Sequence, residues 1–282
     1  MTILAAAGMA VLVLLAGSLP WGPLIRLNLR AGITTPWAVV PMAVYLGAYW
    51  MVVSGRWGGT ANGAQRRTTL HANSLSWPLW CASIAAGLVG FGTILALLAL
   101  MARLVALPDA APITTPPGMP LVTGFALLTM QSLVAGVTEE AAFRGYMQSM
   151  VARHHGVVLA ILAQGTLFGL LHAPNHPGAL LLMLPYYVAV SAVYGGLTWA
   201  ADSILPALVL HAVGDAVVLT RWWLTGRPEW QIGAATPVLL HQSGVDGAFV
   251  AAAIASAALA ATTAVSYFVV RTRSLRESAR PG

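Results

Sequence analysis

Eight apolar stretches, each close to the length of a membrane-spanning helix, dominate this chain of 282 residues. A helix needs about 20 predominantly apolar residues to cross the hydrocarbon core of a bilayer. Only 8% of the residues are charged, whereas a soluble domain carries about 25%. The sequence therefore predicts an all-α, polytopic membrane protein with about eight transmembrane helices, at approximately 2–24, 36–54, 77–105, 120–152, 156–172, 178–200, 203–224 and 245–270.

The segments between these stretches predict loops. Residues 55–76 are rich in Gly and Arg, residues 106–119 are rich in Pro, and residues 225–244 mix Gly, Pro, Trp and polar residues. The first apolar stretch has no positive residue before it, so we expect a retained helix and not a cleaved signal peptide.

The 14 basic residues are all Arg and outnumber the eight acids, giving a net charge of +6. In a membrane protein such residues anchor the ends of helices at the headgroups, so we expect the lipid bilayer and no nucleic acid as a partner. The Lys-free, Ala-rich composition indicates GC-rich coding and a bacterial cell membrane. Eight spans would place eight Arg on the side of the termini and five on the other side. Because the cytoplasmic side of a membrane protein carries the excess of basic residues, this count favours cytoplasmic termini. The basic C-terminal tail contributes Arg271, Arg273, Arg276 and Arg280.

Ionisable residues inside membrane spans are rare and costly, so each one is a candidate functional group. Five of the eight acids fall in loops, at span ends or in the tail, and the remaining three are Glu139, Glu140 and Asp215. Arg144 follows Glu140 by four residues, a spacing that allows an ion pair on one helix face. Glu139 lies about 100° around an α-helix from Glu140 and can therefore point into a cavity.

Two histidines lie in neighbouring spans. His172 ends the run FGLLH, with Phe168 one turn before it, and His211 precedes Asp215 by one turn. If 120–152 and 156–172 form a hairpin, Glu139 lies roughly 20 Å and His172 roughly 25 Å from its turn. We therefore predict that six side chains converge at a similar depth: Glu139, Glu140, Arg144, His172, His211 and Asp215. The charge-based orientation would place them past the middle of the membrane, which requires a tilted or broken helix or the opposite orientation.

Three motifs occur in order on separate apolar spans. They are EExxxR at Glu139–Arg144, FxxxH at Phe168–His172 and HxxxD at His211–Asp215. Together they resemble the motifs of the CPBP family, the CAAX-protease and bacteriocin-processing (Abi) family that includes the Rce1-type prenyl proteases. The resemblance covers about residues 120–225. Asp215 departs from the family pattern, which most often has Asn, and an ionised Asp cannot donate a hydrogen bond to an oxyanion.

The resemblance implies an intramembrane endopeptidase that acts on a membrane-anchored, possibly lipidated, peptide or protein. Glu139 would be the general base that activates a water, assisted by His172. His211 and Asp215 would bind or polarise the scissile carbonyl, and Glu140 with Arg144 would form a supporting pair. Phe168 would support the site mainly by packing.

Two questions stay open at this point. Glu139, His172 and His211 could also hold Zn²⁺, because two His and one carboxylate form the ligand set of hydrolytic zinc sites. We favour metal-free catalysis, which requires no cofactor. Rival functions are a proton-coupled transporter that uses the buried Glu, His and Asp, and a catalytically silent immunity or scaffold protein.

The chain divides into three predicted parts. Residues 1–119 hold the first three helices and their loops, residues 120–225 form the catalytic core, and residues 226–282 comprise a loop, the last helix and the basic cytoplasmic tail. The sequence does not identify the substrate or the oligomeric state.

Overall fold

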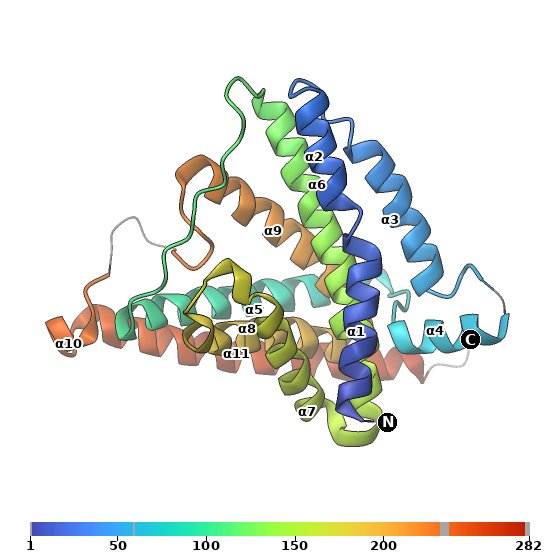
Figure 1. Cartoon of the computed structure of the whole chain (residues 1–282). Helices are drawn as coiled ribbons and strands as arrows, with labels where there is room; N and C mark the ends of the chain where they lie inside the picture. Colours follow the sequence, from blue (N-terminus) through green and yellow to red (C-terminus); the bar gives the residue numbers. More distant parts are fainter. Residues whose placement is uncertain (1, 59, 232–236, 280–282) are drawn as a thin grey trace. The chain divides into compact units, whose positions relative to one another are not determined.

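The computed structural model describes residues 2–58, 60–231 and 237–279, and it contains helices and no β-strand in that part of the chain (Figure 1). The α-helices are α1 (Ile3–Ser18), α2 (Trp21–Ala31), α3 (Val39–Val53), α4 (Thr60–Leu70), α5 (Trp77–Leu104), α6 (Leu121–Glu139), α7 (Gln148–Leu171), α8 (Leu180–Ala201), α9 (Leu205–Thr225), α10 (Leu240–Ser243) and α11 (Gly247–Ser278). A π-helical segment, η1 (Glu140–Met147), joins α6 to α7, and a short 3₁₀ helix, η2 (Ala173–Asn175), follows α7.

Six helical runs in the described part are long and apolar enough to cross a membrane. The expected count of eight differs for two reasons. Helix α3 has only 15 residues, and Leu121–Leu171 is one helical run of 51 residues that covers two of the expected spans. This run is interrupted at Gly156, whose φ of +79° and ψ of 163° are not helical. The six long apolar helices indicate an integral, multi-pass membrane protein.

Three predicted loop or tail regions are partly helical. Residues 225–244, expected to form a loop, contain the four-residue helix α10. Residues 55–76 were expected to form a loop, but they contain α4, which contacts α3 and η1 and buries Leu70 completely. The basic tail continues α11 as far as Ser278, so that Arg271 donates a hydrogen bond to the Trp199 carbonyl (3.1 Å). Arg280 lies outside the described residues. Residues 106–119 contain no helix, as the Pro-rich sequence predicts.

The chain forms two compact units. The first comprises Met1–Asn73, Pro112–Ala160 and Leu208–Gly226. Within it, α1 packs against α3, α6 and η1. Gly17 on α1 lies directly against the side chains of Thr138 and Tyr49, and the Tyr49 hydroxyl donates to the Val13 carbonyl (3.0 Å). The absence of a side chain at Gly17 therefore lets three helices meet closely, as small residues commonly do in membrane helix packing.

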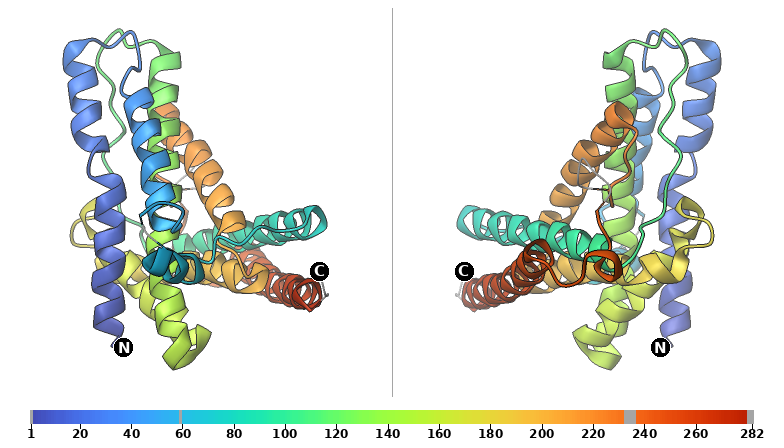
Figure 2. Two further views of the ribbon diagram at one scale, coloured as in Figure 1. Left: turned by 90° about the vertical axis from the view of Figure 1, so that its right-hand side faces the viewer. Right: turned by 90° about the vertical axis from the view of Figure 1, so that its left-hand side faces the viewer.

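The second unit comprises Ser74–Ala111, Ile161–Ala207 and Arg227–Gly282. Its helices α5, α8 and α11 run side by side (Figures 1 and 2). The Tyr267 hydroxyl on α11 donates to the Val193 carbonyl on α8 (2.9 Å), and a Cβ at Gly90 of α5 would lie only 2.6 Å from that hydroxyl. Thr93 and Thr263 share a hydrogen bond of 2.8 Å between α5 and α11. Buried polar groups thus link all three helices, where lipid offers no alternative partner.

Candidate active site

A close contact between α6 and α9 brings the acidic and histidine motifs of the first unit together. A Cβ at Gly136 of α6 would lie 2.8 Å from the Ala212 Cβ of α9 and 3.0 Å from its backbone nitrogen. Only glycine permits this approach without a shift of one helix. Glu139 and Glu140 follow Gly136 by about one turn, and His211 directly precedes Ala212. The backbone contact therefore positions the two glutamates beside His211.

The two glutamates lie at a change of helix type. Glu139 is the last residue of α6, and Glu140 is the first residue of the π-helical segment η1. All eight residues of η1 are buried. The sequence prediction assumed an uninterrupted α-helix here, which the structure corrects. Short π-helical segments are rare and are frequently found at functional sites.

His211 lies between three carboxylates. Its Nδ1 donates to Glu140 Oε1 at 2.7 Å. Its Nε2 lies 3.7 Å from Glu139 Oε2 and 3.6 Å from Asp215 Oδ2. The last two distances exceed a normal hydrogen bond, so these groups face one another across a narrow gap. Because a carboxylate only accepts, the bond to Glu140 fixes a proton on Nδ1 and directs Nε2 toward Glu139 and Asp215.

Exposure separates the two glutamates. The side chains of Glu139 and Asp215 are 17% and 30% exposed, whereas those of Glu140 and Arg144 are completely buried. Glu140 Oε1 lies 3.0 Å from Arg144 Nη1, so that these residues form the ion pair expected from their spacing. Glu139 can therefore meet a substrate or a water, while Glu140 orients His211 from inside the protein.

The FxxxH motif lies in the second unit. His172 follows the last residue of α7, and its Nδ1 donates to the Phe168 carbonyl at 2.8 Å. The centroids of the Phe168 and His172 rings are 4.3 Å apart, and the Tyr187 ring lies 4.7 Å from His172. The structure thus brings together five of the six predicted residues within the first unit. The convergence of His172 with them stays a prediction.

His176, which follows a Pro-containing turn and is not among the predicted site residues, belongs to the same aromatic group. Its ring stacks on Tyr187 with centroids 5.5 Å apart and meets the Trp230 ring edge-on at 5.8 Å. Only 1% of His176 is exposed. Burial lowers the pKa of His176, and the neighbouring His172 lowers it further. The only sequence signal was its position four residues after His172 in HAPNH.

The zinc alternative requires side chains that could surround an ion. Among the described residues, no group of three or more His, Cys, Asp or Glu is arranged to hold a metal. At His211, Nδ1 is engaged by Glu140, so that Nε2 is the nitrogen directed toward Glu139 and Asp215. A zinc ion would need this nitrogen as its ligand.

The contact between Gly136 and Ala212 gives a direct test of the site geometry. We expect Gly136→Ala to separate α6 from α9 and lower the rate of the hydrolysis that the three motifs predict by about 100-fold, because displacements near 1 Å at a catalytic site have effects of this size. Ala212→Gly removes the opposing Cβ, so the double variant should recover part of the rate. Gly47→Ala is a matched control, since no atom lies within 4 Å of a Cβ there. Full activity of Gly136→Ala in initial-rate assays would contradict this role of the helix contact.

The buried Glu–His cluster is consistent with the catalytic site that the three sequence motifs predict. Residues 121–217 match the family described as type II CAAX prenyl endopeptidase, Rce1-like, which is a family of proteases. The match contains all three motifs, from Glu139 to Asp215. No curated protein and no solved structure matches the chain.

Proposed function

We propose that this protein is an intramembrane endopeptidase that hydrolyses a peptide bond of a membrane-anchored substrate. The observation that carries this proposal is the position of His211, between the buried Glu140 and the accessible Glu139 and Asp215. Hydrolysis of a peptide bond is accelerated by a base that removes a proton from the attacking water and by a group that stabilises the charge on the scissile carbonyl oxygen. The Glu139–His211 arrangement offers both.

In this mechanism Glu139 removes a proton from a water, and the resulting hydroxide attacks the carbonyl carbon of the scissile peptide bond. When doubly protonated, His211 presents Nε2–H to the carbonyl oxygen and stabilises the oxyanion that forms. The protonated Glu139 then gives its proton to the amine that leaves. The carbon–nitrogen bond breaks, and the new carboxyl group keeps the oxygen of the water.

The other motif residues act around this step. Glu140 holds the Nδ1 proton of His211, and the Arg144 guanidinium balances the charge of Glu140. Asp215 faces Nε2 and stabilises the protonated imidazole, a role for which an ionised Asp is suited. His172 assists Glu139 at the water, since its own Nδ1–H is bonded to the Phe168 carbonyl and leaves Nε2 as an acceptor.

The test is cleavage of membrane-anchored peptides by the purified full chain reconstituted in vesicles. A library with and without lipidation should yield defined products, detected by mass spectrometry. His211→Gln should lower the cleavage rate at least about 100-fold, because it removes the group that stabilises the oxyanion. His241→Gln, which changes an exposed His on α10, should leave the rate unchanged. No cleavage of any library member by folded protein, or equal rates for the His211 variant and the wild type, would overturn the proposal.

Chelation distinguishes the two versions of the mechanism. We expect cleavage to continue at an unchanged rate after dialysis against EDTA, because Glu139 and the histidines supply the proton transfers in the metal-free scheme. Metal analysis of the dialysed protein provides the control. Loss of activity on chelation that is restored by Zn²⁺ would establish the zinc mechanism instead.

A further inference from the structure

The first unit contains a cavity whose lining includes neither Glu139 nor His211. It has a volume of about 480 Å³, within the range of small-molecule and cofactor pockets. Its walls come from α1, α3, α4, η1 and α7: Met9, Val13, Val52, Val53, Asn62, Gln65, Arg66, Thr69, Tyr146, Met150, Arg153 and His154. The lining is thus mainly apolar on the long helices and polar on α4.

The cationic groups of this cavity have no acidic counterpart. Arg66 donates to the carbonyls of Trp57 (2.8 Å) and Gly58 (3.1 Å). Arg153 donates to the Thr68 carbonyl and the Thr69 hydroxyl, both at 3.3 Å. None of the described lining residues carries a carboxylate. Two guanidinium charges therefore face this space with only neutral oxygens bound to them, which favours an anion as the ligand.

The Arg66 guanidinium also has hydrogen-bonding capacity to spare. Its Nε is buried and has no hydrogen-bond partner among the described residues. Buried polar atoms are normally bonded to protein or water, so an unbonded donor at a cavity is a candidate contact for a ligand.

The position of the cavity along the helices selects the kind of anion. Val52 and Val53 are the last two residues of α3, and Gly55 and Arg56 follow directly. Met9 and Val13 lie one turn apart on α1 and line the cavity beside Val52 and Val53, and the Tyr49 hydroxyl of α3 donates to the Val13 carbonyl. The cavity thus opens where an apolar span ends, which is the level at which lipid headgroups meet acyl chains.

We propose that this cavity binds an anionic phospholipid. The phosphate would lie against Arg66 and Arg153, and an acyl chain would lie along Met9, Val13 and Val52. Guanidinium groups bind phosphate through paired N–H bonds, and basic groups beside membrane spans attract anionic lipids. A free phosphate ion would use the cations but not the apolar wall, and a neutral lipid would use the wall but not the cations.

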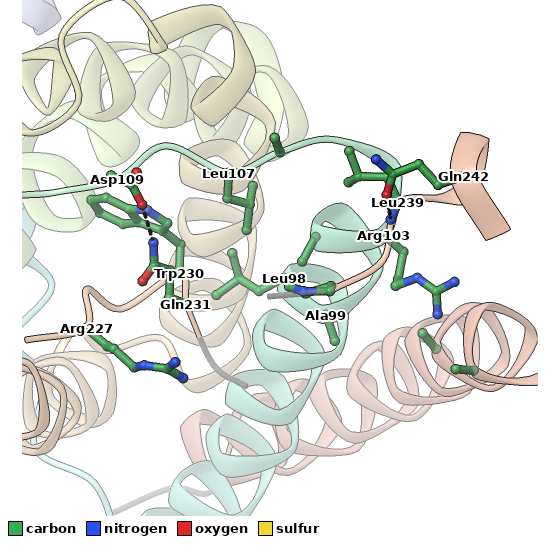
Figure 3. Close-up of a pocket in the computed structure, with 15 residues that line it drawn as sticks. Leu98, Ala99, Arg103, Leu107, Asp109, Arg227, Trp230, Gln231, Leu239 and Gln242 are labelled. Carbon is green, nitrogen blue, oxygen red and sulfur yellow. Dashed lines mark hydrogen bonds between the residues drawn. The ribbon is translucent and has the colours of Figure 1, made fainter. Parts of the chain in front are cut away.

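A cavity in the second unit provides a contrast. It has a volume of about 600 Å³ and lies in the second unit, with Arg103, Asp109, Arg227 and Trp230 in its lining (Figure 3). Its charges are largely balanced, since Arg103 lies 2.6 Å from Asp246 and Asp109 accepts from Gln231. It offers no comparable preference for an anion.

Native mass spectrometry of the full chain with added lipids tests the proposal. Phosphatidylglycerol should bind more tightly than phosphatidylcholine with the same acyl chains. Arg66→Gln/Arg153→Gln should weaken phosphatidylglycerol binding by about tenfold or more and leave phosphatidylcholine binding unchanged. Arg273→Gln/Arg276→Gln removes the same charge from α11 outside the cavity, and its lipid binding should equal that of the wild type. Arg153→Gln/His154→Gln changes only exposed residues, and it replaces the Arg66→Gln/Arg153→Gln variant in this measurement if that variant does not fold.

Each of four results would overturn the inference. The first is equal affinity for the two lipids, and the second is an equal loss of binding in the control variant. The third is displacement of phosphatidylglycerol by an equal concentration of glycerol phosphate, which would show that the acyl chain does not contribute. Met150→Trp should fill the apolar wall and weaken phosphatidylglycerol binding, and unchanged binding in that variant would also contradict it. This measurement of lipid binding does not depend on the proposed proteolytic activity.

Discussion

Glu139→Gln is expected to lower the cleavage rate about 10³-fold or more, because an amide cannot accept the proton of the attacking water. The substitution preserves the size of the side chain and its access to solvent. The rate is measured under single-turnover conditions with a cleavable membrane-anchored peptide, so that substrate binding is separated from the chemical step. Glu277→Gln, near the end of α11, is the matched control and should cleave at the wild-type rate.

The Glu139 variant should also fold like the wild type. Its side chain is 17% exposed, and His211, whose Nε2 lies 3.7 Å from it, keeps its hydrogen bond to Glu140, so that the substitution leaves the charge of His211 compensated. The temperature of unfolding should therefore change little. Substantial cleavage by folded Glu139→Gln protein would remove Glu139 from the role of base.

Arg144→Met is expected to destabilise the protein by about 3–5 kcal/mol, because it leaves a buried carboxylate without its counter-ion. Glu140 and Arg144 are completely buried and 3.0 Å apart, and His211 Nδ1 would be the remaining partner of Glu140. Unfolding in mixed micelles with increasing SDS measures this change in the free energy of unfolding.

The double variant Glu140→Gln/Arg144→Met provides the control for this pair. It removes both charges, and a neutral amide can still accept the His211 proton, so we expect it to be more stable than Arg144→Met alone. Its cleavage rate should nevertheless stay low, because a neutral Gln stabilises a protonated His211 less than a carboxylate does. Wild-type stability of Arg144→Met would contradict the role assigned to the pair.

Substitutions of the two glutamates should thus have different effects on activity and stability, although the two residues are adjacent in sequence. Glu139→Gln should lose activity and keep its stability, whereas variants of the Glu140–Arg144 pair should lose stability as well. This difference follows from exposure alone, since one side chain reaches accessible space and the other does not.

The composition of the site could be predicted from the sequence because charge inside apolar spans is so scarce. Glu139, Glu140 and Asp215 stand out against spans of Ala, Leu and Val, and the spacing of Glu140 and Arg144 predicted their ion pair. The bond from His211 to Glu140 was not predictable, since spacing along one helix does not fix the rotation of another helix against it. Gly136 was overlooked for the same reason, because its role depends on Ala212 of α9.

Two features of the backbone, the π-helical segment and helix α4, could not be predicted from the pattern of apolar residues. The π-helical segment combines small, aromatic and charged residues that an ordinary α-helix also accommodates, so its sequence gives no sign of the change at Glu140. Helix α4 has few apolar residues, and its stability depends on contacts with α3 and η1 that the sequence alone does not reveal. The burial of His176 depends on rings from two distant segments, Tyr187 and Trp230.

Hydrolysis of a membrane-anchored peptide in H₂¹⁸O tests the central claim most directly. Vesicles containing the full chain should release a product with one ¹⁸O in its new carboxyl group. This product should be about 2 mass units heavier than the product released in ordinary water, which is the mass difference between ¹⁸O and ¹⁶O. Glu139→Gln vesicles should release none of it. Cleavage without incorporation of ¹⁸O, or labelled product from the Glu139 variant at the wild-type rate, would contradict a water-activating role for this carboxylate.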